Sequence, residues 1–97
     1  MDQPLRGRVG IVTGAGSGLG EATSRVLAAC GATIIAVDIN GRNVEHVAEQ
    51  IRERGQQAIA LVADVKAWKD VRTVVDQVVA GYGRIDILVN NAAIDHT

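Results

Sequence analysis

The sequence alternates short, continuous apolar runs with longer segments whose apolar residues recur every third or fourth position. A short continuous run is typical of a β-strand that is covered on both faces, and the wider spacing is typical of an amphipathic helix. The runs predict strands at 8–13, 33–38, 57–63 and 85–90, and the segments between them predict helices at 18–29, 41–54 and 67–80.

The helical segments carry their own start and stop signals. Asn40 is a suitable N-cap for the second helix, because its side chain can accept a hydrogen bond from the first turn. Gly31 and Gly55 are expected to end the first two helices, and the Gly-Tyr-Gly sequence at 81–83 to break the third. The predicted inner faces are Leu19, Ala22, Val26, Leu27 and Cys30 on the first helix, Val44, Val47, Ala48 and Ile51 on the second, and Val71, Val74, Val75, Val78 and Val79 on the third.

The regular succession of strand and helix predicts one α/β domain over residues 1–97. Right-handed crossovers make such a sheet parallel, with helices on both faces. We predict the first half of a Rossmann-type, doubly wound parallel sheet with the strand order 3-2-1-4. In this architecture a ligand binds at the carboxyl ends of the strands, in the crevice between the first and fourth strands.

Composition and charge exclude several classes of partner. The net charge is −1 and aromatic residues make up 2% of the chain, which argues against a nucleic-acid-binding surface. No apolar run approaches the length of a membrane-spanning helix, and the N-terminal residues contain no signal-peptide core. Cys30 is the only cysteine, so we expect no internal disulfide and a cytoplasmic location. His46 has no neighbours at metal-ligand spacing, so no metal site is predicted.

The strongest chemical signal is the glycine-rich stretch between the first strand and the first helix, Thr13-Gly14-Ala15-Gly16-Ser17-Gly18-Leu19-Gly20. A strand, a glycine-rich turn and a helix in this order can cradle a dinucleotide pyrophosphate, because the N–H groups of the first helical turn face the anion. Gly14 allows a sharp turn, Gly16 and Gly18 allow the backbone to approach the phosphates, and Gly20 lets the helix lie against the strand. The alternative is a tight turn that binds no ligand.

Asp38 favours the ligand interpretation. It closes the second apolar run, 18 residues after Gly20, near the spacing of roughly 20 that is expected for an acid that binds ribose hydroxyls. Taken alone, Asp38 could also be a solvated strand end. A carboxylate that accepts from both ribose hydroxyls would repel a 2′-phosphate, so we expect NAD(H) to be preferred over NADP(H), with Arg42 as the nearest cation.

Together these motifs resemble the N-terminal part of a short-chain dehydrogenase/reductase, and the resemblance runs from Gly7 to the end of the chain. The glycine-rich stretch matches the family's T-G-x-x-x-G-x-G, and Asp64-Val65 matches its adenine-contacting pair after the third strand. Residues 90–93, Asn-Asn-Ala-Ala, resemble its N-N-A-G, with Ala93 in place of the usual glycine. Lys66 stands where the family often has a capping Ser or Thr, so the third helix is expected to begin less cleanly.

The resemblance implies a set of cofactor-binding residues: Gly14, Gly16, Ser17, Gly18, Leu19, Gly20, Asp38, Asp64, Val65, Asn90 and Ala92. In this assignment the loop, with Ser17 and Leu19, holds the pyrophosphate and the nearby ribose. Asp38 holds the adenosine ribose, and Asp64 and Val65 line the adenine pocket. Asn90 and Ala92 support the adenine side and stabilise the central strands.

The resemblance also implies chemistry whose residues this chain lacks. Family members carry a Ser and a Tyr-x-x-x-Lys in their second half, where the tyrosine exchanges a proton with the substrate oxygen and the nicotinamide transfers hydride. Here Tyr82 is the only tyrosine and Asp86 stands four residues later, so no catalytic residue is assigned.

We therefore expect the NAD-binding part of an oxidoreductase that acts on an alcohol or ketone. The 97 residues alone should be inactive, and the parent protein should be a homo-oligomer. The alternatives are a stand-alone nucleotide-binding or structural module without turnover, and a non-catalytic relative that uses the fold for regulation.

Overall fold

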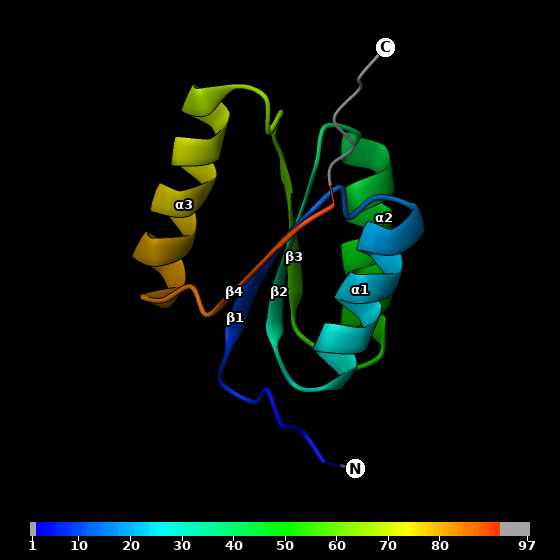
Figure 1. Ribbon diagram of the computed structural model, residues 1–97. Helices are drawn as coiled ribbons and strands as arrows, with labels where there is room; N and C mark the ends of the chain where they lie inside the picture. Colours follow the sequence, from blue (N-terminus) through cyan, green and yellow to red (C-terminus); the bar gives the residue numbers. More distant parts are fainter. Residues whose placement is uncertain (1, 92–97) are drawn as a thin grey trace.

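Figure 1 shows the computed structural model, which describes residues 2–91. In chain order its elements are β1 (Val9–Thr13), α1 (Gly18–Ala29), β2 (Thr33–Asp38), α2 (Gly41–Glu53), β3 (Ala58–Val62), α3 (Trp68–Tyr82) and β4 (Ile87–Asn90). Every predicted strand and helix is present, and the bounds differ from the predicted ones by no more than a residue or two. Ala92 and Ala93 of the last motif lie outside the described residues.

The four strands form one parallel sheet in the order β3-β2-β1-β4, which confirms the predicted topology. The register sets Thr13 opposite Val37 on one side and opposite Asn90 on the other. Asp38, the last residue of β2, follows directly. The carboxyl ends of β1, β2 and β4 therefore meet at one edge of the sheet, and their polar residues come together there.

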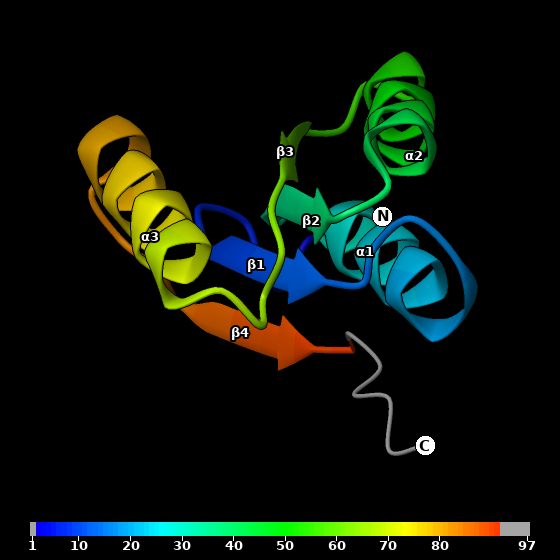
Figure 2. The same cartoon turned by 90° about the horizontal axis from the view of Figure 1, so that it is seen from above.

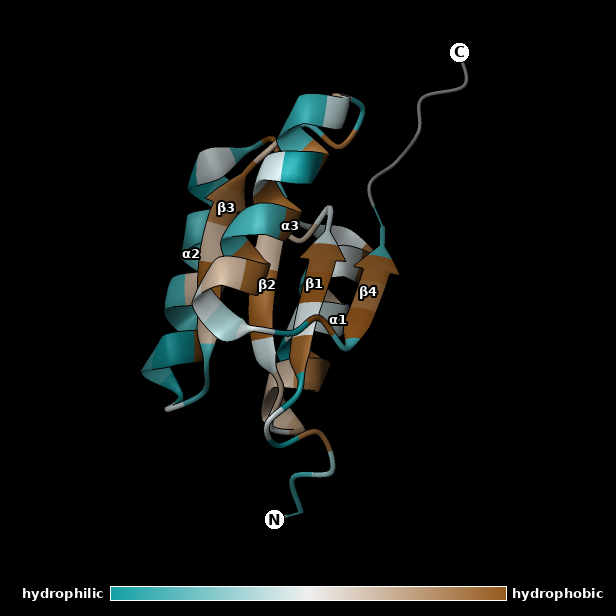
Figure 3. Ribbon diagram, turned by 90° about the vertical axis from the view of Figure 1, so that its left-hand side faces the viewer, coloured by the Kyte–Doolittle hydropathy of each residue, from teal (hydrophilic) through white to brown (hydrophobic). Residues whose placement is uncertain are grey.

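Helices cover both faces of the sheet. Figure 2 shows α1 and α2 on one face and α3 on the other. Each face encloses its own apolar cluster: Val12, Ile34 and Ala36 point toward α1 and α2, whereas Ile11 and Ile35 point toward α3. The strands are the most hydrophobic elements (Figure 3), as a sheet buried on both faces requires. Among residues 2–91 no helix has the length and apolar character needed to cross a membrane.

The inner face of α2 is the predicted one. Val44, Val47, Ala48 and Ile51 are all buried. Asn40 caps the helix as predicted, since its Oδ1 accepts a hydrogen bond from Asn43 N at 3.0 Å. Periodicity is a good guide here because the buried stripe consists of the large apolar residues themselves.

The predicted inner face of α1 is largely wrong, although Leu27 packs against the buried cluster as predicted. Leu19 is 72% exposed and Val26 is 62% exposed, whereas the buried residues are Gly20, Ser24 and Ala28. The helix lies so close to the loop that a Cβ atom on Gly20 would stand 2.0 Å from Gly14 O. Only small side chains fit a helix at this distance, and a hydrophobic periodicity cannot single them out.

Helix α3 differs from its prediction at its end and along its buried face. It continues through Gly81 to Tyr82 and stops at Gly83, which has a φ of 75°. Ala67 provides no side-chain cap, in agreement with the expected irregular start. Only Val74 and Val78 of the predicted stripe are buried, and the neighbouring apolar residues stay partly exposed.

Candidate functional site

The glycine-rich loop sits at the carboxyl end of β1, where the chain turns into α1. Gly14 and Gly18 have φ values of 62° and 55°, a left-handed conformation that favours glycine. The N-cap residue Ser17 is extended, and its side chain forms no cap hydrogen bond. The first N–H groups of α1 are therefore not satisfied by a side chain of the cap, and such groups attract anions.

Asp38 holds this loop against the end of β2. Its Oδ2 accepts a hydrogen bond from Gly16 N at 2.8 Å, and its Oδ1 accepts one from Asn40 N at 3.0 Å. A Cβ atom on Gly16 would lie 2.9 Å from Asp38 Oδ2, so the absence of a side chain lets the two groups meet. An ionised carboxylate has about four acceptor positions, which leaves Asp38 able to accept from a ligand as well.

Thr13 links the ends of β1 and β4. Its hydroxyl donates to Asn90 Oδ1 at 2.7 Å and accepts from Asn91 N at 3.1 Å, and the residue is only 8% exposed. The side chain of Asn90 is thus used inside the sheet edge. Asn91 Nδ2 is buried and has no hydrogen-bond partner in the described part of the chain, so this donor remains available.

The connection from β3 to α3 is shaped by two acidic residues. Asp70 Oδ2 accepts from Asp64 N at 2.8 Å, and Asp64 Oδ1 accepts from Lys66 N at 2.9 Å. Both bonds satisfy N–H groups that precede α3, so they order the turn and do not cap the helix. They hold Asp64, Val65 and Lys66 in a turn at the same edge of the sheet as Asp38.

A hollow of about 390 Å³ opens at this edge, a volume within the range of about 300–1,000 Å³ that is common for small-molecule sites. Seven of the predicted residues line it: Gly14, Ser17, Leu19, Gly20, Asp38, Asp64 and Val65. Gly16, Gly18 and Asn90 are not part of its lining, although Gly16 is bonded to Asp38 beside it. Ala92 lies outside the described residues.

Four further residues line the hollow that the motifs did not single out as ligand contacts: Ile39, Ala63, Lys66 and Asn91. Each directly follows or precedes a predicted residue, and this adjacency is the signal that could have found them. In the described part of the chain the lining contains no tyrosine, histidine or cysteine.

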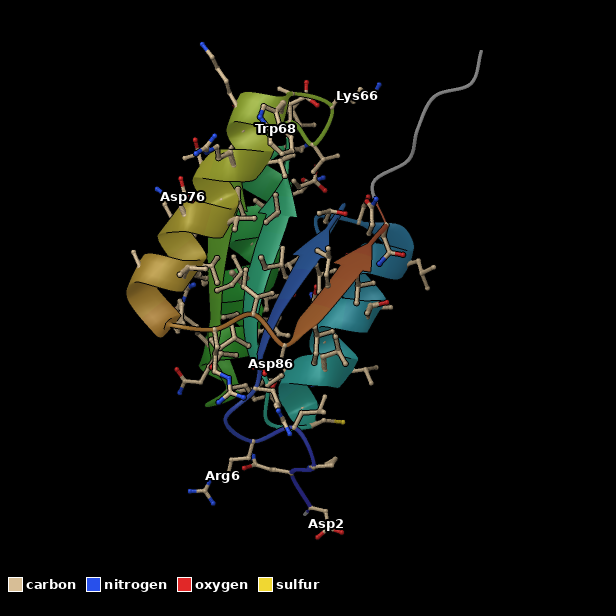
Figure 4. The ribbon with its side chains drawn as sticks, turned by 60° about the vertical axis from the view of Figure 1, so that its left-hand side comes forward. Asp2, Arg6, Lys66, Trp68, Asp76 and Asp86 are labelled. Carbon is tan, nitrogen blue, oxygen red and sulfur yellow. The ribbon has the colours of Figure 1, made fainter. Side chains whose placement is uncertain are left out.

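A third acidic residue near a strand end, Asp86, lies far from this hollow, at the opposite end of the molecule from Lys66 and Trp68 (Figure 4). Its Oδ2 accepts from Arg84 Nε and from Val9 N, both at 2.8 Å, and Arg8 approaches its Oδ1 to 3.4 Å. The hydrogen bond from Arg84 and then that from Val9 N lower the pKa of Asp86 to about 2, while Asp86 raises the pKa of Arg84. Asp86 thus has a structural role.

Comparisons with known proteins agree on one family. The profile described as short chain dehydrogenase matches residues 8–97. The chain is 36% identical over 88 residues to a 7alpha-hydroxysteroid dehydrogenase of Escherichia coli, covering 91% of this chain and 34% of that protein. It is 41% identical over 90 residues to a 3-oxoacyl-acyl-carrier-protein reductase of Thermotoga maritima, covering 93% of this chain and 37% of that protein.

A solved structure gives the same result. A metagenomic short-chain oxidoreductase in complex with NADP superposes with a TM-score of 0.90 at 32% identity, over 94% of this chain and 41% of that one. The chain thus spans 34–41% of the length of these relatives.

Proposed function

This chain belongs to the short chain dehydrogenase family, and from that premise we propose that it is the cofactor-binding part of an oxidoreductase that transfers hydride between NAD(H) and an alcohol or ketone. The observation that carries the proposal is the hollow of about 390 Å³ between the glycine-rich loop, Asp38 and Asp64. It combines a helix N-terminus for a pyrophosphate with a carboxylate for a ribose.

The residues present fit a dinucleotide. The absence of a side chain at Gly16 lets the loop meet Asp38 beside the hollow, and the unpartnered donor Asn91 Nδ2 lies on a residue that lines the hollow. The loop backbone with Gly14, Gly18 and Gly20, together with Ser17 and Leu19, would hold the pyrophosphate and the adjoining ribose.

The adenosine end would be held by the ends of β2, β3 and β4. Asp38 would accept hydrogen bonds from the ribose hydroxyls, while Asp64 and Val65 would line the adenine pocket. Asn90, the last residue of β4, would support that side together with Ala92, and Thr13 keeps Asn90 in place through the 2.7 Å hydrogen bond.

The nicotinamide, when bound, supplies or takes up the hydride. This chain's own residues bind and orient the dinucleotide, and none is assigned to proton transfer: Tyr82, at the end of α3, is not among the residues that line the hollow. We therefore expect no turnover from residues 1–97 alone. In the whole protein, a Ser and a Tyr-x-x-x-Lys would complete the reaction.

We further infer a cytoplasmic protein, because the single Cys30 fits a reducing compartment, and a homo-oligomeric parent by analogy with the family.

The proposal predicts that the purified protein binds NAD⁺ about tenfold more tightly than NADP⁺ in a calorimetric titration. The reason is that Asp38 accepts from both ribose hydroxyls and repels a 2′-phosphate, and like charges brought together disfavour the wrong partner. Asp38→Asn should narrow the difference between the two affinities, since it removes the negative charge. The variant's side-chain oxygen can still accept the hydrogen bond from Gly16 N. Equal or tighter binding of NADP⁺ by the wild type would contradict the NAD preference, and absence of binding of both nucleotides to the folded wild type would contradict the site.

A further inference from the structure

Lys66 is a cationic side chain in the lining of the hollow, and in the described part of the chain no other lining residue is a cation. The other charged residues of the lining are Asp38 and Asp64. Arg42, the nearest cation in the sequence to Asp38, does not line the hollow. The local charge that a ligand meets there is therefore set by two carboxylates and one ammonium group.

The backbone of Lys66 is fixed, and its side chain is not committed to a structural contact. Asp64 Oδ1 accepts from Lys66 N at 2.9 Å, and Asp64 N is in turn held by Asp70 Oδ2 at 2.8 Å. Among residues 2–91 the ammonium group of Lys66 forms no ion pair, and the residue is exposed. A flexible four-carbon stem on a fixed backbone position can follow a ligand phosphate across the mouth of the hollow.

The proposed function gives this ammonium group a definite partner. If Asp38 binds the adenosine ribose, a 2′-phosphate on that ribose enters the same hollow with a charge of about −2. Asp38 then repels the phosphate, and Lys66 is the lining side chain that attracts it.

On these grounds, and resting on the proposed function, we propose that Lys66 is a specificity-determining residue that attracts the 2′-phosphate of NADP(H) and so limits the preference for NAD(H) that Asp38 creates.

The expected effect is modest because the group is exposed. Exposed charge pairs contribute about 0.2–1 kcal/mol, which corresponds to a change in affinity of about 1.4-fold to fivefold. Lys66→Gln should weaken NADP⁺ binding by about that factor and leave NAD⁺ binding unchanged. The difference in NADP⁺ affinity between the wild type and Lys66→Gln should shrink at high salt, because mobile ions screen an exposed interaction.

The chain offers a matched control, because its two lysines are Lys66 and Lys69. Lys69→Gln makes the same change in net charge but lies outside the lining of the hollow, so it should leave both affinities unchanged. Lys66→Arg keeps the charge and should retain NADP⁺ binding. We would titrate the purified wild type and the three variants with NAD⁺ and NADP⁺ by calorimetry, at low and high salt, with thermal melts as a check on folding.

The outcomes separate the two proposals. Selective weakening of NADP⁺ binding by Lys66→Gln, with rescue by Lys66→Arg, supports the role of Lys66 even if the wild type prefers NADP⁺. Equal effects of Lys66→Gln and Lys69→Gln, or equal weakening of both nucleotides by Lys66→Gln, overturn it while the cofactor site stands. Absence of binding of either nucleotide to the folded wild type overturns the proposed function and this inference with it.

Discussion

The two ends of the β1–β4 pair are held together by different chemistry. At the carboxyl end, the Thr13 hydroxyl joins Asn90 and Asn91 through neutral hydrogen bonds. At the amino end, Asp86 joins Val9 N and two arginines in a charged cluster. At the end that carries the hollow, the two strands are thus joined by hydrogen bonds between uncharged groups. At the other end they are joined by a carboxylate and two arginines.

The acidic residues of the two ends differ in the same way. Among the described residues neither Asp38 nor Asp64 forms an ion pair, and their recorded partners are backbone N–H groups. Asp86 has Arg8 and Arg84 as partners. A carboxylate bonded only to a few backbone N–H groups keeps acceptor positions for a ligand, whereas the two oxygens of Asp86 are already occupied by the arginines and Val9 N. The partners of an acid therefore indicate whether it is available for binding.

The largest expected effect is at the carboxyl end, where α1 meets the loop. Gly20→Ala should lower the free energy of unfolding by about 3 kcal/mol and abolish NAD⁺ binding, because the added Cβ would stand 2.0 Å from Gly14 O. Chemical denaturation and calorimetry measure both effects. Gly81→Ala is the control: its Cβ meets nothing within 4 Å, so it should stabilise α3 by roughly 0.5–1 kcal/mol. Equal stabilities of the two variants would contradict the close approach of α1.

The next effect concerns the neutral link itself. Thr13→Val should lower the free energy of unfolding by about 1–3 kcal/mol, because it leaves Asn90 Oδ1 and Asn91 N without the hydroxyl they share. Nucleotide affinity should fall as well, since these groups lie beside the hollow. Thr73→Val is a matched control, because the Thr73 hydroxyl bonds only within α3, to Lys69 O at 2.8 Å; its effect should stay within about 0.5 kcal/mol. An equally small effect at Thr13 would show that the link is dispensable.

The smallest effect belongs to the charged end, and it depends on pH. The pKa of Asp86 is about 2 in the folded protein, against an ordinary value of 3.8. A carboxyl group whose pKa is lowered by folding adds stability above its unfolded value, and that stability is lost as the pH falls from about 3.8 through about 2. Asp86→Asn should therefore be less stable than the wild type at neutral pH, with a difference that closes in this acidic range.

Denaturation of both proteins across the acidic range measures this difference. Asp76→Asn, on the exposed side of α3 (Figure 4), changes the net charge equally. Its difference in stability from the wild type should not change as the pH falls through the acidic range. Nucleotide binding at neutral pH should be unchanged by Asp86→Asn, because the cluster lies at the far end of the sheet from the hollow. A large loss of affinity would remove the distinction between the two ends.

Most of the fold could be predicted because its signals are local. Continuous apolar runs mark strands in a sheet covered on both faces, and the strand–helix succession leads to the parallel order that the structure shows. The glycine-rich loop and Asp38 were also expected at one site, because parallel strands bring their carboxyl ends to one edge, whereas Asp64 was assigned through the family resemblance. Seven of the eleven residues predicted for the site line one hollow.

The sequence by itself thus determined the elements, their order and the edge at which the polar residues gather. Tertiary structure alone decided which face of α1 is buried, since the distance between Gly20 and Gly14 O depends on how the helix packs. It also decided that Asp86 meets Arg8, 78 residues away in the chain, and that Lys66 joins Asp38 in the lining of one hollow. Periodicity and motifs report neighbours along the chain, whereas the partner of a charge and the closeness of two backbones depend on residues that only folding brings together.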